Sequence, residues 1–134
     1  MGDSVKTLTI KEPWASLIIE GYKIYEFRSW KTNYRGKLLI HAGLSLDKSA
    51  KENYKDYNID YRNGKIIGEA TITDCILVDE EFDENLHKIN GDIYGRSSHI
   101  KKYAWKLENI VKYDNPITCK GKLGLWNYGG KNEI

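Results

Sequence analysis

Four side chains of different chemistry lie close together between residues 23 and 30. Lys23 carries an amine, Glu26 a carboxylate and Arg28 a guanidinium, and Trp30 adds an indole ring. Alternation over residues 22–30 predicts a strand with Glu26 and Arg28 on one face. A guanidinium binds phosphate or a base edge, a carboxylate accepts from an exocyclic amine, and an indole stacks on an unpaired base. These residue types could contact a nucleotide, but a solvated surface hairpin with a Glu–Arg pair has the same spacing, and spacing alone does not decide between the two.

The residues that follow bring more polar and aromatic groups toward this segment. Tyr34 and Arg35 lie in a predicted turn, and His41 lies on the predicted strand 37–42. A hairpin would place Arg35 and His41 near Glu26 and Arg28, so we expect both to support binding. A lone histidine on a strand is, however, more often a hydrogen-bonded structural residue. Tyr34 joins Trp30 as a candidate stacking platform.

The chemistry of Lys23 depends on its surroundings. In a partly dry cleft the pKa of a lysine falls toward neutrality and the amine becomes a base, whereas an adjacent carboxylate such as Glu26 keeps it charged. A charged lysine binds ligands and does not abstract protons. The sequence contains no zinc-ligand spacing, glycine-rich phosphate loop or serine nucleophile elbow, so we expect no metal and no cofactor.

Strands dominate the elements that must position these side chains. The patterns predict strands over 7–10, 22–30, 37–42, 65–78, 103–113 and 122–128, helices over 13–21 and 47–57, and a weak helix over 82–89 followed by a loop over 91–100. A long strand bent near Gly68 is typical of a barrel. The strand 103–113 should turn Trp105 and Val111 inward, and Asn115-Pro116 should form a turn. We predict a mainly β (α+β) fold, a small curled barrel with flanking helices.

Composition limits the class of protein. With 134 residues the chain is the size of a single domain, residues 1–134, and 21 basic against 19 acidic residues give a net charge of +2, which excludes histone-like binding. No apolar stretch reaches the roughly 18 residues that a membrane span needs. Cys75 and Cys119 form no CxxC pair, so we expect reduced thiols in a cytoplasmic protein. We expect a monomer.

An ordered run of motifs along the chain resembles the ASCH domain, the homology domain of activating signal cointegrators, in the PUA-like superfamily. The run comprises Pro13-Trp14-Ala15, Gly21-x-Lys23-x-x-Glu26-x-Arg28-x-Trp30, Arg35-Gly36, Leu39-Ile40-His41-Ala42, the Gly68-containing strand, Tyr103-Ala104-Trp105 and Gly121-Lys122-x-Gly124-Leu125-Trp126. This resemblance implies a PUA-like small mixed β-barrel, a cleft at the Gly-x-Lys-x-x-Glu-x-Arg segment, and recognition of RNA or a nucleobase.

The same resemblance raises an enzymatic alternative. Some ASCH relatives hydrolyse N4-acetylcytidine with a lysine, a threonine three residues later and a glutamate elsewhere. Lys23 matches the lysine, but Glu26 stands in place of the threonine. Glu81 or Glu84 would have to supply the remote carboxylate.

We therefore predict an RNA-binding or modified-nucleobase-binding domain with no membrane association. The residues expected to bind are Lys23, Glu26, Arg28, Trp30, Tyr34, Arg35 and His41. The alternative is an amidohydrolase of N4-acetylcytidine or a related nucleoside, with Lys23 and Glu26 as catalytic residues. A third interpretation, a scaffold domain that binds a protein, fits the small net charge.

Overall fold

The computed structural model describes residues 4–129, which form six strands and four helices. The strands are β1 (Val5–Glu12), β2 (Tyr25–Arg28), β3 (Gly36–Leu46), β4 (Lys65–Leu77), β5 (Tyr103–Thr118) and β6 (Leu125–Tyr128). The helices are α1 (Trp14–Ile19), α2 (Lys48–Asn53), α3 (Glu80–Ile89) and α4 (Gly91–Tyr94). None of these helices is long and apolar enough to cross a membrane.

All six strands belong to one strongly curved sheet in the order β2-β5-β4-β3-β1-β6. Only β1 and β3 pair in parallel, and the other neighbours are antiparallel. The predicted mainly β (α+β) fold is confirmed, but a closed barrel is wrong, because no pairing joins β2 to β6 among the described residues. Each of these edge strands has only four residues.

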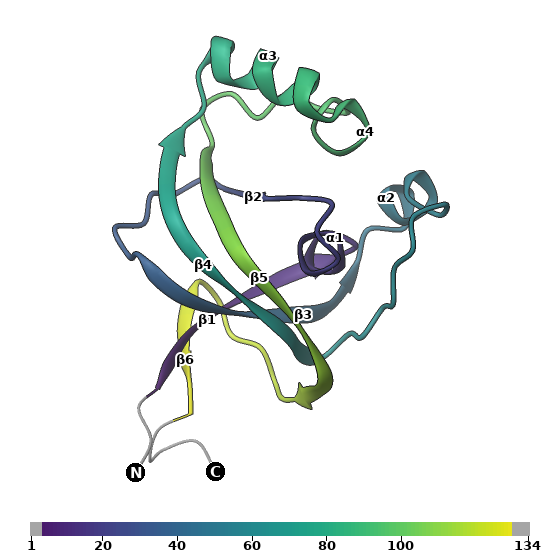
Figure 1. Cartoon of the computed structure of the whole chain (residues 1–134), viewed down its shortest axis with the longest axis vertical. Coiled ribbons are helices and arrows are strands. Elements are labelled where there is room, and N and C mark those ends of the chain that lie inside the picture. Colours follow the sequence, from purple (N-terminus) through teal and green to yellow (C-terminus); the bar gives the residue numbers. More distant parts are fainter. Residues whose placement is uncertain (1–3, 130–134) are drawn as a thin grey trace.

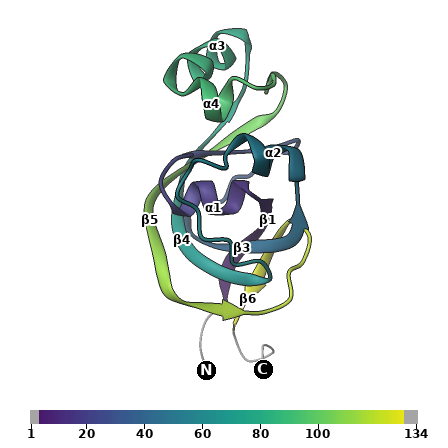
Figure 2. The same ribbon diagram turned by 90° about the vertical axis from the view of Figure 1, so that its right-hand side faces the viewer.

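Helix α1 lies inside the curve of the sheet, which wraps around it in both views (Figures 1 and 2). Ile18 of α1 is fully buried with Leu8, Leu38, Ile67 and Trp105 from four different strands. The expected end of this helix is confirmed, since Gly21 has a φ of +88° and its N–H donates to the Ile18 carbonyl. This left-handed residue turns the chain directly into the segment of Lys23.

A second apolar cluster joins α1 to the remaining helices. Leu17 packs there with Tyr25, Tyr54, Leu86 and Tyr94, all of them buried. Helices α3 and α4 lie beyond one end of β4 and β5, and α2 lies to one side of the sheet near α4 (Figure 1). Asp47 caps α2 by accepting from the Ala50 N–H at 3.0 Å. The helix α4 was not expected from the sequence, which predicts a loop there.

Strand β5 departs from the prediction in two ways. It continues through Asn115-Pro116, where a turn was expected, because β2 pairs only with residues 103–106 and leaves the later half of β5 as a free edge that tolerates proline. Asn109 has a φ of +52° and shifts the alternation. Val111 is consequently 48% exposed instead of buried, and Ile110 packs against the core in its place.

Gly68 allows the backbone of β4 to lie close to both β5 and α1. A Cβ atom at this position would lie 2.3 Å from the Val111 carbonyl oxygen and 2.8 Å from Cδ1 of Ile19. The sequence prediction of an irregularity near Gly68 is confirmed, since the pairing with β5 shifts register between Ile66 and Gly68.

We expect Gly68→Ala to lower the free energy of unfolding by at least ~2 kcal/mol, because a backbone carbonyl cannot yield to the added methyl group. Urea unfolding followed by tryptophan fluorescence measures this loss. Gly91→Ala is the matched control, since a Cβ there meets no atom within 4 Å. Equal stability of the two variants would contradict the steric role of Gly68.

Candidate functional site

A cavity of about 1490 Å³ opens between the sheet, α2, α4 and the loop that precedes β6. Among residues 4–129, its lining has far more basic than acidic groups, because only Glu26 and Asp47 oppose seven basic side chains. The basic residues are Lys11, Lys23, Arg28, Arg96, Lys102, Lys120 and Lys122. The lining therefore has a formal charge of +5, whereas the whole chain has only +2.

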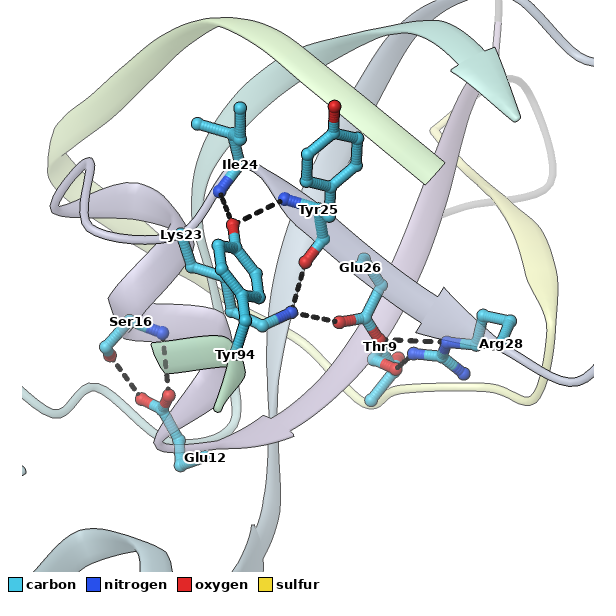
Figure 3. Close-up of polar contacts among 9 residues, drawn as sticks. All are labelled: Thr9, Glu12, Ser16, Lys23, Ile24, Tyr25, Glu26, Arg28 and Tyr94. Atoms are coloured by element: carbon cyan, nitrogen blue, oxygen red, sulfur yellow. Dashed lines mark hydrogen bonds and ion pairs between the residues drawn. The ribbon is translucent and has the colours of Figure 1, made fainter. Parts of the chain in front are cut away.

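Lys23 reaches this cavity because the turn after α1 takes it out of the alternation of β2. Its backbone N–H donates to the Leu17 carbonyl at 3.1 Å. The hydroxyl of Tyr94, on α4, accepts from the N–H groups of Ile24 at 2.9 Å and Tyr25 at 3.3 Å. Helices α1 and α4 thus fix the backbone beside Lys23, and Figure 3 shows the contacts made by Tyr94.

Glu26 bridges Lys23 and Arg28 (Figure 3). One carboxylate oxygen lies 3.3 Å from the Lys23 amine, and the other accepts from Nε of Arg28 at 3.0 Å. The Lys23 amine also donates to the Tyr25 carbonyl, and Nη2 of Arg28 donates to the Thr9 carbonyl at 3.0 Å. The three side chains of the predicted site therefore converge, and Thr9 of β1 fixes the far end of the group.

Burial changes the expected chemistry of Lys23. The residue is 3% exposed, and its burial lowers the pKa of the amine, an effect that Glu26 opposes without cancelling. The sequence argument named both effects and expected the carboxylate to prevail, whereas in the structure the effect of burial is the larger of the two. The amine instead sits in a dry environment 5.0 Å from the centre of the Phe27 ring, where its positive charge depends on Glu26.

Arg28 is the most accessible of these three charged groups. Its side chain is 23% exposed, compared with 4% for Lys23 and 9% for Glu26. The bonds to Glu26 and Thr9 use Nε and Nη2, so hydrogen atoms on Nη1 and Nη2 remain for a ligand. Glu26 and Thr9 thus orient a planar donor group toward the cavity.

The remaining predicted binding residues divide into two groups. Trp30 lines the cavity and is 37% exposed. Its ring makes an edge-to-face contact with the buried ring of Trp105, and the two ring centroids lie 4.8 Å apart. Tyr34 and Arg35 do not line the cavity. The Tyr34 hydroxyl donates to the Lys37 carbonyl, and Arg35 donates to backbone carbonyls of its own turn, so both stabilise that turn.

His41 lines the cavity, but both ring nitrogens already have partners. Nε2 lies 2.7 Å from the Cys119 carbonyl oxygen and therefore donates to it, which leaves Nδ1 to accept from the Thr9 hydroxyl at 3.3 Å. That hydroxyl in turn accepts from the Trp126 indole at 3.1 Å. His41 thus attaches the loop of Lys120 and Lys122 to the sheet, which is the structural role that lone strand histidines commonly have.

Sequence reasoning missed His99, which lies in the segment expected to be a loop. Its ring stacks on Phe27 with centroids 3.9 Å apart and planes 7° apart, and it lines the cavity. Burial, aided by the charges of Lys102 and Lys23, lowers the pKa of His99 to about 4, so the ring is neutral at physiological pH. No sequence pattern pairs His99 with Phe27, because only the fold of α3 and α4 brings them together.

The remote carboxylates considered for catalysis lie elsewhere. Glu81 and Glu84 are exposed on α3, and neither lines the cavity. Among residues 4–129 no group of three histidine, cysteine, aspartate or glutamate side chains is arranged to hold a metal ion. The carboxylates available in the cavity are Glu26 and Asp47, and Asp47 is engaged in capping α2.

Comparison with known proteins agrees with this arrangement of elements. Residues 8–117 match the family model for the ASCH domain. The chain belongs to the ASCH domain family. Activating signal cointegrator 1 from Homo sapiens is 29% identical over 136 residues, and the same protein from Mus musculus is 30% identical. Both alignments cover 92% of this chain but only 22% of the relative, so the chain spans about a fifth of these proteins.

Two further similarities are more distant. L-aspartate dehydrogenase from Thermotoga maritima is 30% identical over 91 residues, which cover 68% of this chain and 35% of that protein. The crystal structure of ASCH from Zymomonas mobilis has a TM-score of 0.51 and 17% identity, and covers 84% of this chain and 72% of that one. A variant of the same protein gives a TM-score of 0.50. These structures share the ASCH fold with this chain.

We expect Glu26→Gln to lower the free energy of unfolding near neutral pH by roughly 3 kcal/mol, since it leaves Lys23 buried without a counter-ion. Because the pKa of Lys23 is lower in the folded than in the unfolded chain, the unfolded chain binds more protons between those two values. Stability should therefore rise with pH across that window, more steeply in the variant than in the wild type.

Urea unfolding at pH about 7 and about 9.5 measures both effects. The double variant with Lys23→Met and Glu26→Gln is the control, because it has no buried amine to leave unpaired, and it should recover most of the loss. A loss that is equal at both pH values and persists in the double variant would show that Lys23 does not depend on Glu26.

Proposed function

We propose that the cavity binds single-stranded RNA or an unpaired nucleobase. The observation that carries this proposal is the distribution of charge. Seven basic and two acidic residues line the cavity, which leaves 14 basic and 17 acidic residues in the rest of the chain. A nearly neutral protein thus concentrates its positive charge in one hollow, as the electrostatics of binding a polyanion requires.

Within the cavity Arg28 is the group best suited to contact the ligand. Its fixed guanidinium offers paired N–H donors, which match a phosphate or the acceptor edge of a base. Lys23 and Glu26 are too deeply buried to meet a phosphate, so we assign them to orienting Arg28. Membership of the ASCH family is consistent with an RNA-type ligand.

An unpaired base also needs an aromatic surface, and two indoles of the cavity lining offer one. Trp30 is partly exposed and rigidly held by Trp105, so a base stacked on it costs little side-chain entropy. Trp14, half-buried on α1, lies against both apolar clusters and also lines the cavity. Stacking on such rings contributes about 1 to 3 kcal/mol per base.

We expect Arg28→Ala to weaken binding of single-stranded RNA about tenfold or more, because a guanidinium contact contributes about 1 to 3 kcal/mol. Fluorescence anisotropy with a labelled oligouridine at low salt measures this. Arg35→Ala is the matched control, since it removes the same charge outside the cavity and should change affinity little. Absence of RNA binding, or equal losses in the two variants, would overturn the proposed site.

One observation favours an amidohydrolase as the second candidate. Burial lowers the pKa of Lys23, and a lysine with a lowered pKa next to a carboxylate is a candidate base. Against this, the amine already donates to Glu26 and Tyr25, and the negative charge of Glu26 would repel an oxyanion that forms beside it. Binding therefore accounts for the geometry better than hydrolysis does.

We expect the unmodified protein to release no cytidine, or only traces, from N4-acetylcytidine. Glu26→Thr should raise the release if any substitution does, because it restores a hydroxyl and removes the repulsive charge. Chromatography of the reaction products with purified protein measures turnover, and Lys23→Ala is the control. Robust cytidine production by the unmodified chain that is lost in Lys23→Ala would replace the binding assignment with an enzymatic one.

A further inference from the structure

A second hollow lies on the side of α2 that faces away from the cavity. We call it the α2 groove, a depression of about 360 Å³ whose lining includes three lysines and three tyrosines. These are Lys48, Lys51, Lys55, Tyr54, Tyr57 and Tyr61. One acidic residue, Glu52, lines it as well. The groove thus repeats the combination of basic and aromatic side chains found in the cavity.

The α2 groove and the cavity share a wall. Tyr54 lines both hollows, and Ser49, Ala50 and Asn53 line the cavity from the same helix. Helix α2, which is six residues long and about 10 Å across, therefore separates the two hollows. A bound nucleic-acid strand that leaves the cavity over α2 would enter the α2 groove directly.

The charges of the α2 groove are available to a ligand. Lys55 pairs with Glu52 at 3.1 Å, but these side chains are 65% and 73% exposed, so water and salt weaken the pair. The Lys51 amine lies 5.2 Å from the centre of the Tyr61 ring. Lys48 has no ion pair among residues 4–129. A lysine beside a tyrosine ring presents one nucleotide with a charge for its phosphate and a surface for its base.

Two of the three tyrosines of the groove, Tyr54 and Tyr57, are held in fixed positions. Tyr57 makes edge contacts with Tyr22 at 4.8 Å and with Tyr54 at 5.4 Å, and its hydroxyl donates to Asp92 at 3.3 Å. The Tyr54 hydroxyl donates to the Asp92 carbonyl at 2.8 Å. Rings held in this way lose little freedom when a base contacts them.

The size of the cavity also points to an extended ligand. Pockets for small ligands have volumes of about 300 to 1,000 Å³, and this cavity exceeds that range before the groove is added. A free nucleoside would leave much of the hollow and most of its positive charge without contacts. A single-stranded RNA of several nucleotides would fill more of the hollow and contact more of its positive charge.

We propose that the α2 groove is a second contact surface for the same RNA strand, which crosses α2 from the cavity and places phosphates at Lys48, Lys51 and Lys55 and a base at Tyr61. This inference rests on the proposed function of the cavity. It identifies the ligand class as single-stranded RNA of several nucleotides, in contrast to a free nucleoside.

The test compares two labelled oligouridines, a dinucleotide and a strand of about ten nucleotides, by fluorescence anisotropy over a range of salt concentrations. In the triple variant with Lys48→Gln, Lys51→Gln and Lys55→Gln, affinity for the longer strand should fall at least tenfold, and the slope of log affinity against log salt should decrease by about 2. Dinucleotide binding should stay unchanged. Tyr61→Leu leaves every charge in place and should weaken the binding of the longer strand without changing the binding of the dinucleotide.

The control is a second triple variant with Lys6→Gln, Lys88→Gln and Lys106→Gln, which removes the same charge outside both hollows. Unchanged affinity for the longer strand in the α2 variant, or an equal loss in the control, would overturn the α2 groove as a contact surface. If dinucleotide binding still requires Arg28 in that case, the proposed function of the cavity stands. If neither oligouridine binds the wild type, both proposals fail.

Discussion

The carboxylate of Glu26 neutralises a buried amine and orients a guanidinium at the same time, and the geometry of the cavity depends on it. Lys23 lies in a dry environment where an isolated ammonium is costly, so the chain needs a counter-charge within 3.3 Å. If residue 26 were a threonine, another group would have to neutralise the charge of Lys23. The Glu26 carboxylate therefore makes it feasible to bury Lys23 in the wall of the cavity.

Groups from strand β1 and helix α4 hold the backbone and the side chains around this pair. Tyr94 accepts two N–H groups next to Lys23, and Thr9 accepts from Arg28 while its hydroxyl joins His41 to Trp126. Strand β1 and helix α4 thus have direct effects on where the charges lie. Loosening either element would disturb the site without touching a charged residue.

Much of the site could be predicted from the sequence because it is local. Lys23, Glu26 and Arg28 lie within six residues, and the helix end at Gly21 and the strand alternation together determine their directions. Arg35 was misplaced because its own turn offers backbone carbonyls closer than the cavity does. Short-range patterns carry no information about that competition.

The parts that the sequence did not reveal depend on long-range pairing. The stack of His99 on Phe27 needs the segment that contains α3 and α4 to fold back onto β2. The strands β2 and β6 at the edges of the sheet are also shorter than alternation alone suggested. The shift of alternation in β5 likewise comes from one left-handed residue, Asn109, and the pattern of hydrophobic residues does not reveal such a backbone conformation.

Charge in this molecule is arranged in two zones, and each zone supports a different property of binding. Lys23, Glu26 and Arg28 carry one net positive charge, are fixed by hydrogen bonds and are largely shielded from salt, and Arg28 is the member of this group that reaches the cavity most openly. Lys11, Lys120 and Lys122 lie around them in the cavity lining, where ionic strength has a stronger effect. In the binding that we propose, the outer lysines would attract a polyanion to a chain of nearly neutral total charge, and Arg28 would contact it inside the cavity.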